Sequence, residues 1–199
     1  MSTDDVPNLT PARSDVVLHA LEEQLRTSGE SFELVVIGGT ALQALGIVDR
    51  STKDVDVVAL MKDSTLLPAS PLPPELERAA AIVARDFRLP EDWLNAGPTG
   101  LLEWGLPAGL LDRVETKVLG PNLTVHFAGR FDQIHFKLYA MVDQGAGKHE
   151  RDLRSMRPTQ SELLDAARWA RTHDPSPGFE QELRAALRYL GVEDADLGD

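Results

Sequence analysis

The chain has 199 residues, and its 32 acidic and 20 basic side chains give a formal net charge of −12. With 42% hydrophobic residues, this length is enough for one globular domain, or for a core domain with a helical addition. The absence of cysteine excludes disulfides, thiolate zinc sites and a cysteine nucleophile. The negative charge argues against nucleic-acid binding over the whole surface, because such binding needs a basic face.

The N-terminal segment MSTDDVPNLTPARSD has neither the cationic start nor the apolar run of a signal peptide. No apolar run in the chain approaches the roughly 18 residues that span a bilayer. We therefore expect a cytoplasmic protein with no membrane partner, and we expect residues 1–13 to form a flexible tail.

The first half of the chain predicts alternating helices and strands. Apolar residues at helical spacing, with Ser14 as the N-cap, predict a helix over about 15–27. The runs FELVVIGG and DVDVVAL predict two strands, and between them residues 40–45 predict a short helix that Gly46 ends. After the proline-rich PASPLPPE, the run PELERAAAIVARDF predicts another helix, and LPEDWLNAGPTG predicts a loop anchored by its tryptophan.

The second half of the chain begins with a predicted hairpin and then becomes helical. DRVETKVLGPNLTVHFAG has two strand-like runs separated by residues 120–122. From residue 130 the pattern predicts four helices, the third opened by a capping box of Thr159 and Glu162. We expect an α/β (α+β) core over 14–128, with a mixed sheet flanked by helices, and a C-terminal helical region over 129–199 that completes a cleft.

The strand DVDVVAL carries two acids among valines. Side chains two apart on a strand point the same way, so Asp54 and Asp56 share one face while Val55 and Val57 enter the opposite, buried layer. Two adjacent carboxylates repel each other unless a cation lies between them, and Mg²⁺ is commonly held by such a pair together with substrate phosphates. The pair therefore predicts a metal site, although a solvated strand face is the alternative for an isolated Asp-x-Asp.

The preceding strand ends in a double glycine. At Gly38 and Gly39 the backbone N–H groups can approach a phosphate closely, and a helix that begins at Thr40 favours negative charge. A Gly-Gly turn alone is unspecific, and this one lacks the pattern of a dinucleotide site or a P-loop. The turn and the acid pair together, in this order, predict a phosphate cradle next to a metal clamp.

The segment VVIGGTALQALGIVDRSTKDVDVV resembles the signature of the nucleotidyltransferase superfamily, which has the DNA polymerase beta-like fold. Its R-x-T-x-D-x-D motif consists of Arg50, Thr52, Asp54 and Asp56. This form is most similar to the bacterial branch that contains abortive-infection nucleotidyltransferase toxins and relatives of unknown function. In that branch a later lysine and aspartate complete the site, and FKLYAMVDQGAGKHERDL places Lys137 and Asp152 at the matching positions. The resemblance covers roughly residues 34–156.

The resemblance implies an enzyme that uses Mg²⁺ or Mn²⁺ to transfer a nucleoside monophosphate from a nucleoside triphosphate (NTP) to an acceptor hydroxyl. The acceptor would be RNA such as tRNA, or a protein, and small hydroxylated molecules also stay open. A toxin of this branch would have a cognate antitoxin as partner. The implied catalytic residues are Asp54, Asp56, Lys137 and Asp152, the first two as metal ligands. The implied nucleotide-binding residues are Gly38, Gly39, Thr40, Arg50 and Thr52.

One expected feature is missing from the sequence. The strand LTVHFAG carries His126 where polymerase-like members have a third carboxylate, and Glu115 is the only strand acid that could substitute. The alternative function is therefore a catalytically weak relative that binds nucleotide or a partner protein in a regulatory, antitoxin-like role. Asn95 could also line the cleft. The stripe Lys148, Arg151, Arg154 and Arg157 could receive a triphosphate or an RNA backbone, or be a solvated face.

Overall fold

A six-stranded mixed sheet lies at the centre of the N-terminal part of the fold, in a computed structural model that describes residues 8–193 and 196–197. The strands follow the order β3-β2-β1-β6-β5, with β4 paired to β2. Strand β1 is antiparallel to β2 and parallel to β6. The strands are β1 (Phe32–Ile37), β2 (Val55–Lys62), β3 (Thr65–Leu67), β4 (Leu94–Asn95), β5 (Glu115–Gly120) and β6 (Leu123–Phe127).

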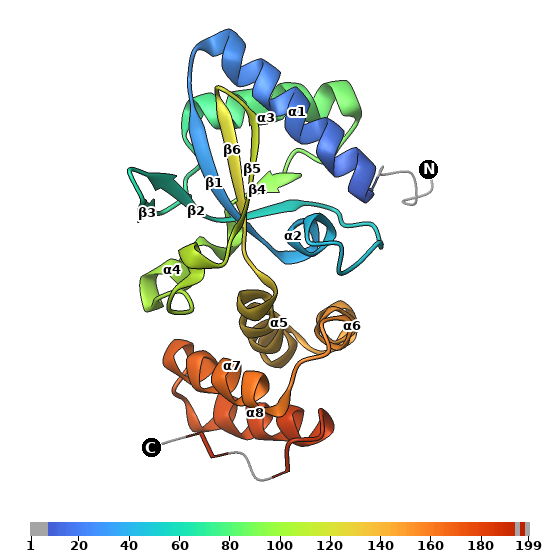
Figure 1. The fold of residues 1–199 in the computed structure, drawn as a ribbon, viewed down its shortest axis with the longest axis vertical. Helices are drawn as coiled ribbons and strands as arrows, with labels where there is room; N and C mark the ends of the chain where they lie inside the picture. The colour runs from blue at the N-terminus through green and yellow to red at the C-terminus, as the bar shows by residue number, and fades with distance from the viewer. Residues whose placement is uncertain (1–7, 194–195, 198–199) are drawn as a thin grey trace.

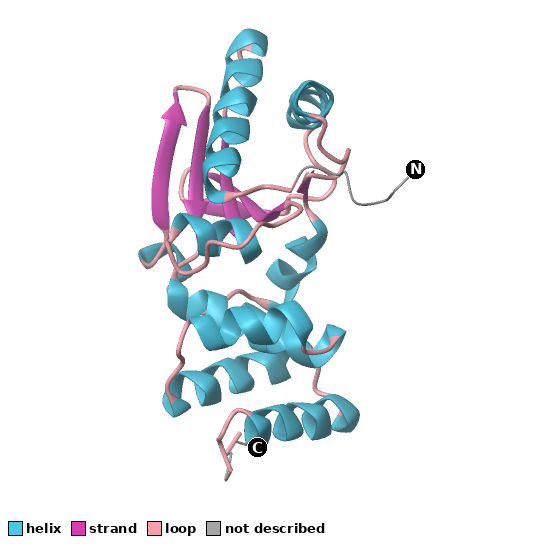
Figure 2. Ribbon diagram, turned by 90° about the vertical axis from the view of Figure 1, so that its right-hand side faces the viewer, coloured by secondary structure: helices cyan, strands magenta, loops and turns pink. Residues whose placement is uncertain are grey.

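Helices flank this sheet and form the C-terminal region, as the α/β sequence pattern predicts (Figure 1). Those of the N-terminal part are α1 (Pro11–Ser28), α2 (Gly38–Ala44), α3 (Pro74–Phe87) and α4 (Leu101–Trp104), with 3₁₀ turns at Gly97–Gly100 and Leu110–Asp112. The C-terminal region contains the four predicted helices, α5 (Arg130–Gln144), α6 (Gly147–Ser155), α7 (Gln160–His173) and α8 (Pro177–Tyr189). Figure 2 shows α1 and α3 on one side of the sheet and the C-terminal helices stacked beyond its end.

The strand parity expected for β2 is confirmed. Val55 and Val57 are fully buried in the hydrophobic core that α1 and α3 form against the sheet. Val58 and Ala59 enter a second core on the other face, where Phe136 of α5 also packs. A third core fills the C-terminal region and contains the predicted apolar stripe of α5, made by Ile134, Leu138 and Met141. Helix α5 therefore packs against both the sheet and the C-terminal helices.

The first helix begins earlier than the sequence predicts. Thr10, not Ser14, is the N-cap, and Pro11 occupies the first turn, where its missing N–H costs nothing. Leu9 is fully buried and its backbone pairs with that of Thr52. Of residues 8–13, predicted as part of a tail, Leu9 is thus packed on the core and Pro11 begins α1, whereas residues 8, 10, 11 and 12 are exposed. Residues 1–7 of that prediction lie outside the described residues.

Two further boundaries differ slightly from expectation. Helix α2 begins at Gly38 instead of residue 40, so the double glycine forms its first turn. The predicted loop after α3 contains the short strand β4, because the backbone N–H of Val55 donates to the carbonyl of Trp93. Trp93 is fully buried and its Nε1 donates to the carbonyl of Ala80, which confirms that this tryptophan anchors the segment.

Candidate functional site

A cavity of about 590 Å³ lies where β1 and β2 meet the helices of the C-terminal region. Side chains from the sheet, the loop before β2, α4, α5 and α6 form its charged and polar part. These include Asp54, Asp56, Asn95, Glu103, Lys137, Lys148 and His149. The cavity brings both predicted metal ligands together with the Gly38 turn and with Lys137, although more than 80 residues of chain separate Asp54 from Lys137.

The carboxylate of Asp56 lies directly against the glycine turn. Asp56 is opposite Ile37 in the β1–β2 register, and Gly38 follows with φ of +78°. A Cβ on Gly38 would come within 2.5 Å of Asp56 Oδ2. Only glycine therefore accommodates both this backbone conformation and this carboxylate.

Asp56 is held in an environment that disfavours its charge. Burial raises its pKa, and the neighbouring charge of Asp54 raises it further. The amide of Asn95 donates to Asp56 Oδ1 at 3.2 Å, and this bond and the charges of Lys137 and Lys148 act in the opposite direction. A cation between the two carboxylates would offset the free-energy cost of keeping both of them charged. Gly38, which faces Asp56, has no Cβ that could obstruct such a cation.

The glycine N–H expected to bind phosphate already has a partner. Gly38 N donates to Gln133 Oε1 at 3.1 Å, and the Gln133 amide donates in turn to the carbonyl of Ala128 at 3.3 Å. Gln133 is fully buried. The Gly38 N–H therefore orients the turn and is not a free phosphate donor, and Gln133 is a site residue that the sequence pattern does not reveal.

Thr40, after the glycine turn, and Thr52 of the motif both contact Asp54. Thr40 Oγ1 donates to the main-chain carbonyl of Asp54 at 2.8 Å, and Thr52 Oγ1 lies 3.5 Å from Asp54 Oδ1. A Cβ on Gly39 would approach Thr52 Oγ1 to 2.6 Å, so this glycine makes room for the threonine. Gly39, Thr40 and Thr52 lie outside the cavity lining, and they position Asp54 within its loop.

Lys137 and Asp152 form a buried ion pair. Lys137 Nζ lies 2.8 Å from Asp152 Oδ2, and the exposed fractions of the two side chains are 7% and 1%. Arg50 also donates to Asp152, from Nε at 2.8 Å and from Nη2 at 2.6 Å. Lys137 lines the cavity, whereas Arg50 and Asp152 are not among its lining residues.

This arrangement decides what Asp152 can do. Burial raises its pKa, but the hydrogen bonds from Arg50 and the charge of Lys137 outweigh burial, so the pKa lies below the ordinary aspartate value. A carboxylate that accepts from two cations and has a lowered pKa is a weak proton acceptor. Its geometry suits a positioning residue that holds Lys137 at the cavity and Arg50 in the loop before β2.

Lys148 and His149 add a second basic group and a neutral imidazole to the cavity. Burial lowers the pKa of His149 to about 4, and the charges of Lys137 and Lys148 lower it in the same direction. His149 Nδ1 is buried without a hydrogen-bond partner in the described part of the chain. No ligand spacing marks this histidine in the sequence. Of the basic stripe on α6, Lys148 lines the cavity while Arg154 pairs with Glu150 at 2.8 Å.

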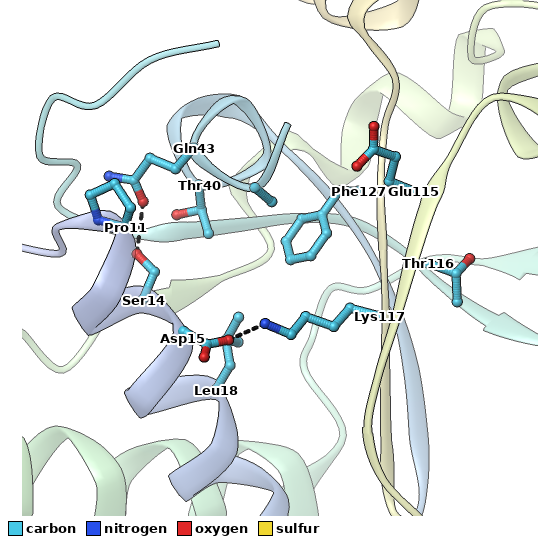
Figure 3. Close-up of a pocket in the computed structure, with 11 residues that line it drawn as sticks. Pro11, Ser14, Asp15, Leu18, Thr40, Gln43, Glu115, Thr116, Lys117 and Phe127 are labelled. Carbon is cyan, nitrogen blue, oxygen red and sulfur yellow. Dashed lines mark hydrogen bonds and ion pairs between the residues drawn. The ribbon is translucent and has the colours of Figure 1, made fainter. Parts of the chain in front are cut away.

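Glu115 does not supply a third carboxylate to the aspartate cavity. It lines a separate cavity of about 320 Å³ between α1, α2 and β5, together with Thr40, Lys117 and Phe127 (Figure 3). His126 is also occupied elsewhere, between Glu33 at 3.0 Å and Thr116 at 2.8 Å. Across the described residues, no group of three or more His, Asp or Glu side chains is placed to hold a metal ion.

Asn95, in contrast, does line the aspartate cavity, as its place in the DWLNAG segment suggests. It pairs with Asp56 across β4 and β2, so the strand position beside the acid carries a neutral amide.

Among the described helices, none has the length and apolarity to cross a membrane. Comparisons of the chain with protein-family models, with curated proteins and with solved structures found no match.

Proposed function

We propose that this chain is a nucleotidyltransferase that moves a nucleoside monophosphate from an NTP to an acceptor hydroxyl, with pyrophosphate as the leaving group. The observation that carries the proposal is the cavity in which Asp54, Asp56 and the glycine turn face Lys137. Its volume of about 590 Å³ is within the usual range for small-molecule sites. The resemblance of the β1-to-β2 segment to the superfamily signature supports the same assignment.

Asp54 and Asp56 would hold Mg²⁺ or Mn²⁺. Bound there, the metal would supply charge neutralisation and orientation for the α-phosphate during in-line displacement. Two carboxylates are a usual protein contribution to such an ion, with substrate phosphates completing its ligands. The raised pKa of Asp56, caused first by burial, fits a site that gains stability when a cation arrives.

Lys137 would neutralise part of the triphosphate charge. Its side chain is 7% exposed, so its charge acts in a medium that screens it less than bulk water does. Lys148 adds a second positive charge from α6. Arg50 and Asp152 would act through Lys137 and the loop before β2, by keeping both in place.

The test is transfer of label from each α-labelled NTP, with Mg²⁺ or Mn²⁺, to cellular RNA and to a protein extract from the same cells. We expect one NTP and one class of acceptor to become labelled in a metal-dependent manner. Thermal stabilisation should need metal and NTP together, because the phosphates complete the metal site. Absence of both label transfer and joint stabilisation would overturn the proposal.

Replacing Asp56 by Asn should lower transfer by about a hundredfold or more, because the metal loses a charged ligand. The fold should persist, since the change keeps volume and Asn95 can still donate to the new amide oxygen. Asp63→Asn is the matched control, because Asp63 is exposed at the β2–β3 turn with φ of 49°, a conformation that Asn tolerates. A marked loss of melting temperature in Asp56→Asn would instead make Asp56 a structural residue.

A second candidate is a relative that binds nucleotide or a partner protein without catalysing transfer. The observation that favours it is that, among the described residues, no third carboxylate joins Asp54 and Asp56 in a group placed to hold a metal ion. This candidate predicts that NTP raises the melting temperature while no acceptor becomes labelled. A regulatory partner such as an antitoxin-like or toxin-like protein would then be sought by copurification.

A further inference from the structure

The aspartate cavity has a second part that is apolar and aromatic. Its lining here consists of Leu101, Trp104, Phe136, Tyr139, Ala140 and His173. Helix α4, which carries Trp104, and helix α6, which carries Lys148 and His149, lie on opposite sides of α5 (Figure 1). One continuous cavity therefore offers both charged groups and ring surfaces, and Glu103 places one carboxylate beside Trp104.

Trp104 is unusual among the large apolar side chains of this protein. It is 65% exposed although it lines a cavity, whereas Trp93 is fully buried. Within the described residues, Trp104 makes no ring contact and no hydrogen bond through its indole N–H. An exposed indole at a cavity wall leaves a large apolar face available to a ligand.

The backbone that carries Trp104 is held in place from α7. Trp169 Nε1 donates to the carbonyl of Gly105 at 3.0 Å, and His173 Nε2 lies 3.4 Å from the carbonyl of Leu101. These contacts fix both ends of α4 and leave the Trp104 side chain free. The exposure of Trp104 is therefore a feature of an anchored segment.

Tyr139 and His173 of the cavity lining pack together with Trp169 as a cluster of rings. The Tyr139 ring lies 5.7 Å from that of His173 and 6.1 Å from that of Trp169, and Trp169 and His173 are 4.1 Å apart. Burial raises the pKa of Tyr139, so its phenol is neutral at neutral pH. A planar ligand could lie against the Trp104 ring, with the carboxylate of Glu103 as its charged neighbour on α4.

We propose that the aromatic part of the cavity binds the nucleobase of the NTP, with the base stacked on Trp104. The inference rests on the proposed function and adds a residue that recognises the base. A nucleotide has the same two-part character as the cavity, since its phosphates are anionic and its base is a planar ring. The phosphates would lie near Lys137 and Lys148, and the base near Trp104 and Tyr139.

The experiment separates base binding from phosphate binding. Kd values of the full chain with Mg²⁺ are measured for the four NTPs and for inorganic tripolyphosphate, which has no base. We expect Trp104→Ala to raise the Kd of the preferred NTP about tenfold, the size of effect expected for loss of one stacking partner. The Kd of tripolyphosphate should stay the same, and Trp104→Phe should keep most of the NTP affinity because it keeps an aromatic face.

A second readout and a matched control accompany these measurements. NTP should quench tryptophan fluorescence of the native chain, and the quench should be smaller in Trp104→Ala, which keeps the fully buried Trp93 and the partly buried Trp169 of the ring cluster. Val118→Ala serves as the control, since Val118 is 70% exposed on β5 and lies outside this cavity. It should leave both Kd values unchanged.

The possible outcomes distinguish a failure of the stacking inference from a failure of the proposed function. An unchanged NTP Kd in Trp104→Ala, or an equal loss for NTP and tripolyphosphate, would overturn the stacking inference while the proposed function stands. If the native chain binds neither NTP nor tripolyphosphate with Mg²⁺, the proposed function fails and the inference fails with it. A selective loss of NTP affinity together with a reduced quench in Trp104→Ala would support both the proposed function and the stacking inference.

Discussion

Gly38 is the residue at which backbone geometry and site chemistry depend on each other most directly. Its φ of +78° is unfavourable for any side chain, and an added Cβ would lie 2.5 Å from Asp56 Oδ2. We expect Gly38→Ala to destabilise the fold by about 1 to 3 kcal/mol, because strain and a contact with a carboxylate add together. Transfer activity and metal-dependent stabilisation should both be lost, because Asp56 must move.

Chemical denaturation and the labelled-NTP assay measure these two effects. Gly178→Ala is the matched control, because Gly178 is in the first turn of α8 and an added Cβ there would meet no atom within 4 Å. Gly178→Ala should leave the free energy of unfolding unchanged or raise it slightly, since Ala favours a helix more than Gly does. Full activity in Gly38→Ala would show that the close approach to Asp56 is not needed.

Part of the site could be predicted from single residues. The alternation of Asp54 and Asp56 with valines places the acids on one face of β2, and the structure places them in one cavity with Gly38. Gln133 and Asn95 could not be predicted in their roles, because their partners Gly38 and Asp56 are distant in sequence and local patterns do not record such contacts. Because the contact with Gln133 is not visible in the sequence, the Gly38 N–H was predicted to be free to bind phosphate.

At the scale of elements, periodicity and caps identified most helices and strands, and the errors lie at their ends. Helix α1 starts at Pro11, since the tertiary contacts of Leu9 keep the preceding chain on the core. The short strand β4 has two residues, too few for a pattern, and it forms because β2 offers an unpaired edge. Local sequence thus predicts the interior of an element better than its boundary.

The predicted capping box of α7 is present and has a third member. Glu162 accepts from the backbone N–H of Thr159 at 2.8 Å, and Arg130 at the start of α5 lies 2.5 Å from Glu162 Oε1. Arg130 also donates to the carbonyls of Met156 and Arg157, at the end of α6. Arg130 therefore joins the start of α5, the end of α6 and the first turn of α7.

This cluster predicts a pH dependence of stability. The hydrogen bond from Arg130 lowers the pKa of Glu162 from 4.5 to about 2. Because the folded-state pKa is depressed, the stabilisation is complete above pH 4.5 and is lost as the pH falls toward about 2. We expect Glu162→Gln to cost about 1 kcal/mol at pH 7, less than the full pKa shift implies, because the pair is partly exposed and solvent screens it.

Urea denaturation at several pH values tests this expectation. In Glu162→Gln the free energy of unfolding should fall less steeply between pH 4.5 and pH 2 than in the native chain. Asp165→Asn is the control, because Asp165 forms an exposed pair with Arg168 on the same helix and should contribute little. Equal pH slopes for the native chain and Glu162→Gln would refute the assignment.

At the scale of the whole molecule, one carboxylate joins the loop before β2 to the C-terminal helices. Asp152 of α6 binds Arg50 of that loop and Lys137 of α5, and only 1% of its side chain is exposed. Arg50 and Asp152 are about 100 positions apart in the sequence. No local pattern therefore indicated that Lys137 and Asp152 approach Asp54 and Asp56; only the family resemblance did. The pairing of Arg50 with Asp152 was not predicted, because both are also usual surface residues.

The role of Asp152 can be decided by comparing stability with activity. Asp152→Asn removes the anion shared by two cations, one of them almost fully buried, and should cost about 3 kcal/mol of stability. Hydrogen exchange should become faster in α6. Asp143→Asn, an exposed change at the end of α5, is the control and should alter neither quantity.

A double variant makes this prediction sharper. Adding Lys137→Met to Asp152→Asn removes the buried cation left without its partner, so the double variant should recover at least about 1 kcal/mol relative to additivity. Transfer should stay low in the double variant, because Lys137 lines the cavity and is the cation proposed to neutralise the NTP. If Asp152 were instead the base for the acceptor hydroxyl, Asp152→Asn would abolish transfer while its melting temperature and the exchange of α6 stayed native. A stable but inactive Asp152→Asn variant would therefore show that Asp152 takes part in the reaction as a base. If instead Asp152→Asn is unstable and Lys137→Met restores part of its stability, Asp152 is the residue that holds Lys137 in place.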